Sequence, residues 1–444
     1  MRQAARAIVA VTLLLLTAGR VQGQASPTPA PTPTPIPTPT PAPTCGGRVA
    51  CQCGDTLVGT YVMQSDLVCN GAGLTLGDGA VLRCNHHTIT GPGGDNSFFG
   101  IYLFQAHGAK VRYCKVTGFR RGVRIDQGAG NLVENVEAFG NGDPVSHRQG
   151  GYGIDVGSST DNLIRKCYVH DNADEGIHIG GGSDRTTLRN TKSFDNFREQ
   201  LYVFDNSGVV LIGNKLRGSQ QTSAAVFFMK QSLGGTVSDL QTENGNFTIR
   251  GGSRGNAIER LKTTAGGIRF ETDETGAPSG NRILRSRVNR AFECLRYRSA
   301  FDNAIIDSSF SGCTFGIIGN GTSDQPAQIT LAGVTVPPQA SITLDSFSTL
   351  DVAWHLDVVV RDAANDPVPS AMVTVTDGQG QTVVSASTDP SGRIATADIL
   401  VEQSIGTSSA SFTPHHVVAD KAGVGSAALD VTLTGNRSLV LVLR

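Results

Sequence analysis

The sequence is poor in aromatic residues, in charge of either sign and in long apolar runs. Of its 444 residues, 6% are aromatic, with a single Trp, and the formal net charge is −1. Without an excess of Lys and Arg there is no basic footprint for nucleic acid, so nucleic acid is not an expected partner. No apolar run approaches the roughly 20 residues of a membrane-spanning helix, so no transmembrane segment is expected.

Helical periodicity is also missing. The 54 Gly residues are too many for helical repeats, because each Gly in a helix interior costs about 1 kcal/mol relative to Ala. Short runs instead alternate apolar and polar residues, as in residues 153–157 (Gly-Ile-Asp-Val-Gly) and 176–180 (Gly-Ile-His-Ile-Gly). This alternation predicts short strands with one buried face.

The alternating unit recurs with a mean period of 24 residues. The position of Asp155 is held in the other units by Tyr102, Arg124, His178, Tyr202, Phe227, Thr248, Arg269, Arg296 and Ile318. A fixed period of this size is typical of a solenoid, in which stacked repeats form one continuous core. The sequence therefore predicts an all-β chain with a parallel β-helix of about ten rungs.

A second short run in several units begins with Asn. These Asn residues occupy one rung position and are Asn131, Asn162, Asn256, Asn281 and Asn303. We expect an internal stack of amides that satisfies polar groups at a sharp bend of each rung. With these runs and this period, residues 55–350 resemble the right-handed parallel β-helix family, which includes pectate-lyase-like and NosD-like repeat proteins. The resemblance implies a right-handed solenoid but no particular activity, because this fold hosts enzymes, adhesins and scaffolds.

Alternation assigns an inward and an outward column to each strand. The expected buried pairs are Ile101/Leu103, Val123/Ile125, Ile154/Val156, Ile177/Ile179, Leu201/Val203, Val226/Phe228, Ile268/Phe270 and Leu295/Tyr297. Besides the column through Asp155, a second outward column is expected to hold Phe104, Asp126, Gly157, Gly180, Phe204, Met229, Arg250, Glu271 and Arg298.

Composition divides the chain into five parts. Residues 1–25 have a charged start, a short apolar run and small residues at the end, as in a secretory signal peptide. Residues 26–44 alternate Pro with Thr, Ala and Ser and predict an extended polyproline II spacer. Residues 45–99 are expected to form a disulfide-rich cap with the first rung, and residues 100–350 the β-helix. In residues 351–444 longer alternating strands predict a small antiparallel β-sandwich.

The last part resembles the carboxypeptidase-regulatory-like, immunoglobulin-like module. The resemblance rests on Val360-Arg-Asp, on residues 367–371 (Pro-Val-Pro-Ser-Ala) and on Thr388-Asp-Pro-Ser-Gly392. It implies an accessory domain without catalytic residues.

Five of the nine Cys lie in residues 45–99. An exported chain favours disulfides over a metal site there. Cys114 and Cys167 share one rung position, two rungs apart, and are expected to be small core residues. Cys294 and Cys313 lie one rung apart, where a disulfide is possible.

The middle rungs collect outward residues suited to uronate chemistry. The residues are Arg124, Asp126, Asp155, His178 and Tyr202. Proton abstraction next to a sugar carboxylate needs that charge neutralised, which Arg124 or a calcium ion on Asp126 and Asp155 would do. A base and an acid are also needed, and His178 and Tyr202 are the candidates.

Tyr152-Gly-Ile-Asp155 resembles the Tyr-Gly-x-Asp-Pro-His motif of mannuronan epimerases. Val156 and Gly157 stand where that family has Pro and the catalytic His. The resemblance implies that Tyr152 and Asp155 lie in a catalytic site, and our hypothesis is that His178 of the next rung replaces the missing His.

A loop insertion precedes this motif at residues 140–151. Solenoid insertions often flank binding faces, so His147 and Arg148 join Tyr102, Arg124 and Asp126 as expected substrate-binding residues.

These features predict a monomeric, secreted or cell-surface protein that binds or acts on an acidic polysaccharide. Two alternatives stay open. One is a uronate lyase or epimerase that uses Asp155, His178 and Tyr202, and the other is a non-catalytic adhesive or structural protein. Hydrolysis, which needs a spaced pair of carboxylates such as Asp126 and Asp155, is a third enzymatic option. No cofactor is expected except the calcium ion.

Overall fold

The computed structural model describes residues 44–146, 150–219, 227–337 and 341–444. The expected signal peptide, nearly all of the Pro-rich spacer, and the residues His147, Arg148 and Val226 lie outside these ranges. Every element in the described part of the chain is a β-strand, and no helix there is long and apolar enough to cross a membrane.

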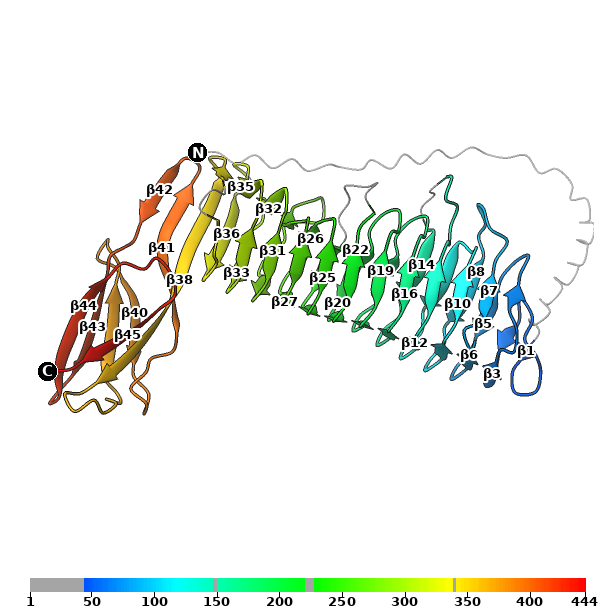
Figure 1. Cartoon of the computed structure of the whole chain (residues 1–444), viewed down its shortest axis with the longest axis horizontal. Coiled ribbons are helices and arrows are strands. Elements are labelled where there is room, and N and C mark those ends of the chain that lie inside the picture. Colours follow the sequence, from blue (N-terminus) through cyan, green and yellow to red (C-terminus); the bar gives the residue numbers. More distant parts are fainter. Residues whose placement is uncertain (1–43, 147–149, 220–226, 338–340) are drawn as a thin grey trace, which may run out of the picture. The chain divides into compact units, whose positions relative to one another are not determined.

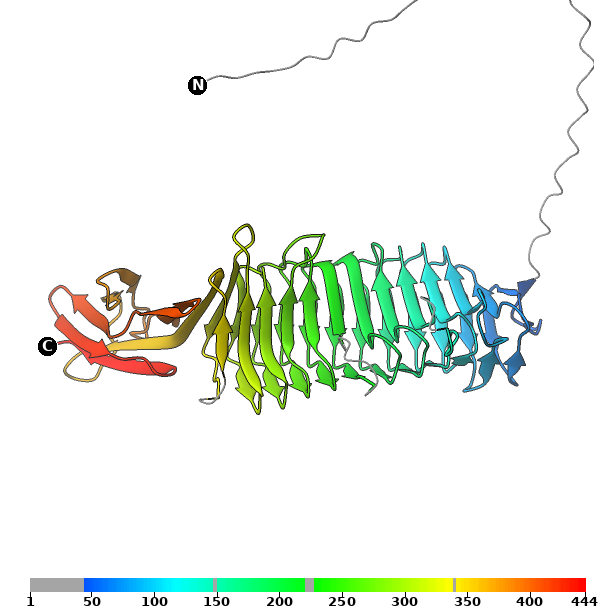
Figure 2. The same cartoon turned by 90° about the horizontal axis from the view of Figure 1, so that it is seen from above.

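A parallel β-solenoid of about 12 turns forms most of the described chain (Figures 1 and 2). The first sheet consists of β1 (Thr44–Cys45), β2 (Thr56–Leu57), β5 (Leu74–Leu76), β8 (Phe99–Phe104), β11 (Arg121–Asp126), β14 (Tyr152–Gly157), β17 (Ile177–Gly180), β20 (Leu201–Ser207), β23 (Phe227–Leu233), β26 (Phe247–Arg250), β29 (Ile268–Glu271), β32 (Glu293–Arg298), β35 (Phe315–Asn320) and β37 (Ile342–Leu344).

The second sheet follows the first within each turn. It consists of β3 (Thr60–Val62), β6 (Val81–Arg83), β9 (Lys110–Arg112), β12 (Leu132–Glu134), β15 (Leu163–Arg165), β18 (Thr187–Arg189), β21 (Val210–Ile212), β24 (Thr236–Ser238), β27 (Ala257–Glu259), β30 (Arg282–Leu284), β33 (Asn303–Ile306), β36 (Ala327–Ala332), β38 (Ser348–Arg361), β41 (Ala397–Ile405), β42 (Ser408–Ser411) and β45 (Arg437–Val442).

The third sheet closes each turn. It consists of β4 (Leu67–Val68), β7 (Thr88–Thr90), β10 (Lys115–Thr117), β13 (Glu137–Phe139), β16 (Tyr168–His170), β19 (Lys192–Phe194), β22 (Lys215–Arg217), β25 (Gln241–Glu243), β28 (Lys262–Thr264), β31 (Arg287–Asn289) and β34 (Ser309–Ser311).

The expected parallel β-helix is confirmed, but the rung number of about ten is too small. Turns also occur before Tyr102, where β2 pairs in parallel with β5, and β5 pairs in parallel with β8. These strands are only two or three residues long, so they lack the alternation by which the repeat is recognised in the sequence.

The inward columns match the expectation on most rungs. Ile154 and Ile177 are register partners, as are Val156 and Ile179, and all four are buried. One rung differs, because Phe228 rather than Phe227 is the register partner of Tyr202. Phe227 and Met229 are buried in the core, so their assignment to the outward columns is wrong. The turn is one residue longer than the repeat suggests, and a one-residue shift exchanges the two faces of a strand.

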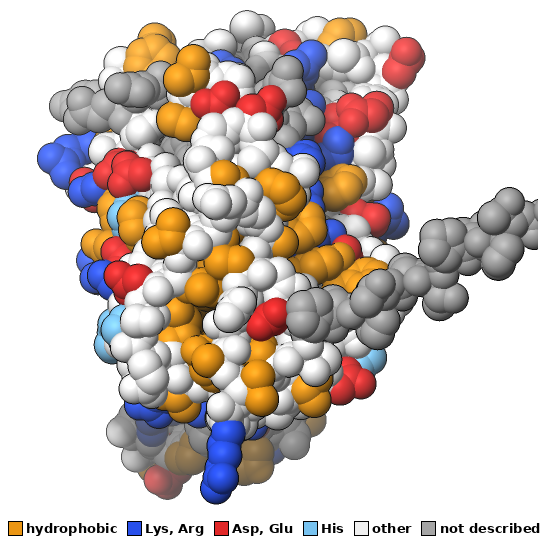
Figure 3. All heavy atoms as spheres, turned by 90° about the vertical axis from the view of Figure 1, so that its right-hand side faces the viewer, with side chains coloured by type: hydrophobic (Ala, Val, Ile, Leu, Met, Phe, Trp, Pro, Cys, Tyr) orange, Lys and Arg blue, Asp and Glu red, His pale blue; other side chains and the backbone are white. Residues whose placement is uncertain are grey.

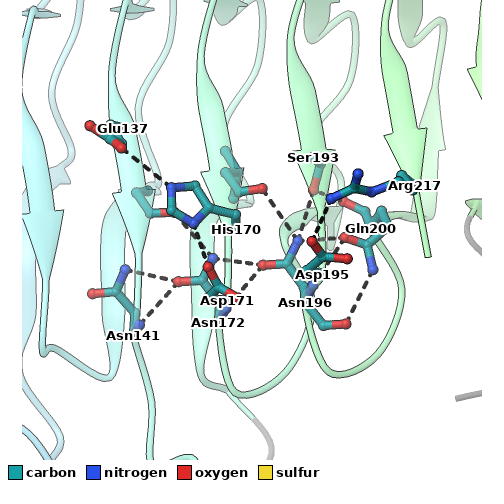
Figure 4. A network of polar contacts seen from close by, with 12 residues as sticks. Glu137, Asn141, His170, Asp171, Asn172, Ser193, Asp195, Asn196, Gln200 and Arg217 are labelled. Carbon is teal, nitrogen blue, oxygen red and sulfur yellow. Dashed lines mark hydrogen bonds and ion pairs between the residues drawn. The ribbon is translucent and has the colours of Figure 1, made fainter. Parts of the chain in front are cut away.

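Asparagine ladders occur at two corners of the solenoid. At the expected corner Asn131 Nδ2 donates to Asn162 Oδ1 at 3.1 Å, and Asn281 Nδ2 donates to Asn303 Oδ1 at 2.8 Å. All five predicted Asn residues are buried, so the predicted stack is confirmed. A second, unpredicted ladder of Asn141, Asn172 and Asn196 lies between the third and first sheets (Figure 4).

Four disulfides join Cys45 to Cys51, Cys53 to Cys69, Cys84 to Cys114, and Cys294 to Cys313. The expected bridge between Cys294 and Cys313 is therefore present. Cys167 is buried and unpaired. Cys114 and Cys167 are both buried core residues, as expected, but Cys114 is also bonded to Cys84 on the preceding rung, which was not predicted.

The first two disulfides lie at the end of the solenoid that faces the viewer in Figure 3. Hydrophobic side chains gather there between polar ones, and Val49, Val58 and Val68 are exposed.

After the solenoid, β38 pairs with β36 in parallel, with β41 antiparallel and with β45 in parallel. A separate four-stranded sheet contains β40 (Thr382–Ser387), β39 (Met372–Thr376), β43 (His415–Lys421) and β44 (Gly425–Val431). Both groups bury apolar side chains in one cluster, which includes Val358, Val373 and Val417. The immunoglobulin-like and carboxypeptidase-regulatory-like assignments stay predictions.

His355 of β38 bridges two carboxylates. Its Nδ1 lies 2.6 Å from Asp398 Oδ1 and its Nε2 lies 2.7 Å from Asp307 Oδ1. Burial lowers the pKa of His355, but the hydrogen bonds and charges of the two carboxylates outweigh burial and raise the pKa above its ordinary value.

Candidate functional site

The predicted outward column is assembled on the first sheet. Arg124 is the register partner of Tyr102 on one side and of Asp155 on the other. Asp155 in turn is paired with His178, and His178 with Tyr202. Successive side chains therefore stack at about 4.8 Å along the solenoid, and the repeat brings these five residues together.

Asp155 lies on the outward face but is fully buried, with 0% of its surface exposed. Its Oδ1 lies 2.9 Å from His178 Nδ1. Its Oδ2 lies 2.8 Å from Arg121 Nε and also accepts a hydrogen bond from Arg124 Nη1. Charged neighbours on the adjacent rungs thus cover this carboxylate completely.

The ion pairs determine the protonation of Asp155. Burial raises the pKa of a carboxylate, but the hydrogen bond from the His178 ring and the positive charges of Arg121 and Arg124 hold the pKa of Asp155 below its ordinary value. Asp155 is therefore an anion that orients its neighbours, and it is not a base open to solvent.

The glycines of the second outward column make room for the charged side chains. A Cβ at Gly157 would lie 2.6 Å from Arg124 Nη2, and a Cβ at Gly180 would lie 2.9 Å from His178 Cε1. The Arg124 guanidinium and the His178 ring therefore occupy the space above these glycines.

His178 is held from three sides. Its ring stacks between those of Tyr152 and Tyr202, with centroid distances of 5.1 Å and 5.5 Å. Asp155 binds its Nδ1, while its Nε2 hydrogen-bonds to none of the described residues. The side chain is 19% exposed. Since Asp155 accepts from Nδ1, the neutral ring presents Nε2 as an acceptor.

A third outward column lies three residues before the first one and was not predicted. It holds Phe99, Arg121, Tyr152, Glu175 and Glu199, and the register Phe99–Arg121–Tyr152 is direct. The sequence carries a signal for it, because Phe99, Arg121, Tyr152 and Glu175 each precede the first Gly of a unit.

Glu175 is the most perturbed acid of this column. It is 6% exposed, and its Oε2 has no hydrogen-bond partner among the described residues. Burial, followed by the negative charges of Asp174, Glu199 and Asp155, raises the pKa of Glu175 to about 9 against the opposing charge of Arg198. Glu175 is therefore a neutral carboxylic acid near pH 7 and can donate a proton.

The tyrosines beside His178 also keep their protons. Burial and the charge of Glu175 raise the pKa of Tyr202 to about 12. Burial, with Glu175, Asp174 and Asp155, raises the pKa of Tyr152 further above its ordinary value. Both hydroxyls are therefore hydrogen-bond donors near neutral pH.

Aromatic rings lie on both sides of the Asp155–His178 pair. Tyr102 packs against Phe99 at 4.8 Å and against Phe104 at 5.4 Å. On the other side the ring of Tyr202 is nearly parallel to that of Phe204, with a centroid distance of 6.0 Å and an interplanar angle of 5°. These rings give the face apolar surfaces next to polar groups.

The residues predicted for calcium do not fit that ion as arranged. Arg124 binds Asp155 through Nη1 and lies 3.1 Å from Asp126 Oδ1 through Nη2. The guanidinium thus stands between the two carboxylates where the cation would bind, and no cluster of three metal-ligating residues occurs among the described residues.

The loop insertion contributes Gly142, Asp143 and Gly151 to a cavity of about 570 Å³, which Arg120 also lines. This cavity lies beside the start of β14. His147 and Arg148, the other residues predicted from the insertion, lie outside the described residues.

Comparison with known proteins identifies the solenoid. The family model for a right-handed beta helix region matches residues 67–216 and 99–265, which confirms the expected right-handed β-helix. No curated protein sequence is significantly similar to this chain.

Three solved structures illustrate what the chain is similar to. The catalytic unit of an α-1,3-glucanase from Streptomyces thermodiastaticus has 9% identity and a TM-score of 0.49, over 70% of this chain and 69% of that one. A mannuronan C-5 epimerase module from Azotobacter vinelandii has 14% identity and a TM-score of 0.31, over 61% and 84%. An alginate lyase from Paenibacillus has 14% identity and a TM-score of 0.33, over 67% and 93%.

Proposed function

We propose that the protein recognises an acidic polysaccharide along the first sheet and moves a proton at one of its uronate units through His178. The observation that carries this proposal is the Asp155–His178 pair. A buried carboxylate fixes Nδ1, and the partly exposed ring lies between two tyrosines with Nε2 unpartnered among the described residues. A neutral imidazole fixed in this way is a general base.

An extended glycan suits the geometry of the face. The stacked columns repeat at about 4.8 Å, so a polymer that lies along the solenoid meets a similar set of side chains on each rung. Tyr102 and Phe104 at one side of His178, and Phe204 at the other, offer apolar surfaces for sugar rings.

The proposed reaction begins with transfer of a proton from the carbon beside the uronate carboxyl group to His178 Nε2. The electrons of the broken C–H bond move into the carboxyl group. Protonated Glu175 can hydrogen-bond to that group and offset its charge. If the electrons return to expel the neighbouring glycosidic oxygen, which takes a proton from Tyr202 or Tyr152, the product is an unsaturated sugar. If the carbon instead takes a proton on the opposite face from Tyr202 or Tyr152, which His178 later reprotonates, the product is an epimer.

Asp155 acts in this scheme as a positioning residue. It is fully buried and reaches substrate only through His178. Inverting hydrolysis is less well supported, because Asp155 and Asp126 both bind Arg124 and leave no spaced pair of free carboxylates.

Recognition without turnover is the second candidate. It is favoured because Arg121 and Arg124, the two arginines nearest to the Asp155–His178 pair, both form ion pairs with Asp155. Uronate chemistry benefits from a free cation at the sugar carboxylate, and these two are already engaged.

A panel assay tests both candidates. The purified protein is incubated with alginate, polygalacturonate and a neutral glucan, and products are followed by ultraviolet absorbance of unsaturated ends and by NMR of sugar composition. His178→Gln is expected to abolish product formation but not retardation in a polysaccharide-loaded gel. His107→Gln is the matched control, because His107 also binds an aspartate but lies at an exposed position away from the pair. Retardation without product supports recognition alone, and absence of both overturns the proposal.

A further inference from the structure

The third sheet carries a second set of outward columns that the proposed function does not use. One column runs Tyr168, Lys192, Lys215, Gln241 and Lys262 in direct register. It belongs to strands β16, β19, β22, β25 and β28, on a different face of the solenoid from His178.

The neighbouring column begins with a stack of rings. His170 lies between Phe139 and Phe194, with centroid distances of 5.4 Å and 4.9 Å and interplanar angles of 9° and 13°. The Arg217 guanidinium covers the far side of Phe194 at 5.3 Å, and Tyr168 leans against Phe194 at 4.7 Å. Figure 4 shows His170 and Arg217 on this side of the solenoid, next to the second asparagine ladder.

A hollow of about 500 Å³ follows these columns. We define the basic surface as its lining residues Tyr168, Lys192, Phe194, Lys215, Arg217 and Lys262. It extends across five strands, from β16 to β28, or about 19 Å at the rung spacing. Tyr168 remains 42% exposed, so a ring face is open to a ligand.

The basic surface holds more positive charge than its own contacts neutralise. Arg217 is paired with Asp195 at 2.6 Å, and Lys192 lies over the Tyr168 ring at 5.7 Å. Lys215 and Lys262 are exposed and form no ion pair with any described residue. Glu243 is the single carboxylate in the lining. The formal charge of the whole chain is −1, so this concentration of cations is local.

We infer that the basic surface is a second binding site for an acidic polysaccharide, separate from the face that carries His178. Regularly spaced cations meet the carboxylates of a linear polyanion, while Tyr168 at one end of the hollow packs against a sugar ring. Four disulfides favour an oxidising compartment outside the cytosol, which favours an acidic glycan over nucleic acid as the polyanion. The inference does not depend on turnover at His178, because the two sites share no residue.

The test compares charge reversals in the full chain. Lys215→Glu/Lys262→Glu is expected to weaken binding to polygalacturonate by at least about tenfold at low salt, with a smaller difference at high salt. Lys110→Glu/Arg437→Glu is the matched control, since both residues are exposed, lie outside the third sheet and change the net charge equally. Tyr168→Ala is expected to weaken binding at every salt concentration, and Phe292→Ala, at another exposed aromatic residue, is expected to leave it unchanged.

The readouts separate this site from the first one. Affinity is measured in a His178→Gln background, where no product forms, so failure of the proposed reaction does not affect the result. Equal affinities of the charge-reversal variant and its control would overturn the inference. So would binding of single-stranded DNA or polyphosphate as tight as that of polygalacturonate, because the surface would then select charge without regard to sugar.

Discussion

Asp155→Asn is expected to destabilise the middle of the solenoid strongly. The carboxylate is 0% exposed and binds His178 at 2.9 Å, Arg121 at 2.8 Å and Arg124. Its loss leaves two guanidinium groups close together, and among the described residues only Arg124 keeps another carboxylate partner, Asp126. Removal of one partner from a buried charged cluster typically costs about 3–5 kcal/mol.

The assay must report on the affected rungs. The single Trp, Trp354, lies in β38, so its fluorescence does not sense β11, β14 and β17. Urea unfolding followed by circular dichroism gives the global free energy, and hydrogen exchange of peptides from these three strands gives the local one. A local loss of about 3 kcal/mol corresponds to roughly hundredfold faster amide exchange.

Asp161→Asn is the matched control. Asp161 binds Arg185 through two hydrogen bonds of 2.7 Å, but both side chains are exposed. Exposed ion pairs contribute little, so this variant is expected to unfold like the parent protein. Parent-like exchange in β11, β14 and β17 of Asp155→Asn would refute the assignment of Asp155 as the anchor of a buried ion-pair cluster.

Four further changes test other parts of the structure. Cys114→Ala opens the loop closed by the bond to Cys84, 30 residues away, and is expected to cost about 3–4 kcal/mol in denaturant unfolding. Asn281→Ala removes four buried hydrogen bonds of the ladder and is expected to cost about 2–4 kcal/mol in the same assay. His355→Gln should remove a stabilisation that is complete below the ordinary His pKa and is lost as pH rises through the raised pKa of the folded protein, measured by melting temperature against pH. In the parent protein, the free energy of unfolding should fall as pH rises from the ordinary Glu pKa to about 9, because Glu175 ionises in the unfolded chain but not in the folded one. Glu175→Gln should remove this fall, which is measured as stability against pH.

Each of these changes has either a control variant or an outcome that would contradict the reasoning. Cys167→Ala removes a thiol without opening a loop, and an effect as large as that of Cys114→Ala would contradict the disulfide argument. A parent-like Asn281→Ala protein would mean that water replaces the ladder contacts. For His355, His416→Gln is the comparison, since His416 binds one exposed aspartate, and equal pH profiles would contradict the bridge. A Glu175→Gln protein with the parent pH slope would show that Glu175 is ionised in the folded state.

The period of the repeat predicts much of the fold and the composition of the site. Alternation around Asp155 and His178 fixes which residues share a strand face, and the mean spacing fixes their neighbours on adjacent rungs. Arg124, Asp155, His178 and Tyr202 are stacked in the predicted order for this reason. The residues that pair on adjacent rungs can be predicted from the number of residues per rung, provided that every turn has the same length.

This prediction of strand pairing fails where the turns differ in length. The extra residue between Tyr202 and Phe228 reverses the inward and outward assignment of β23. The sequence does not predict the bond between Cys84 and Cys114, because the repeat is recognisable in the sequence only from Tyr102 onward. Without the earlier rungs, the position of Cys84 beside Cys114 could not be predicted.

Burial on an outward face is a separate property, which periodicity does not predict. Asp155 points away from the core and yet is inaccessible, because the long side chains of Arg121 and Arg124 fold over it and Gly157 leaves them space. The protonation of Glu175 depends on the same kind of burial, together with carboxylates of its own rung and of both neighbouring rungs. Both effects arise from side chains of adjacent turns acting together, so a buried anion that orients His178 and a neutral acid beside it follow from the three-dimensional arrangement. The proton chemistry proposed for this face depends on these two groups, and for that reason Glu175→Gln and Asp155→Asn test it as directly as any change at His178.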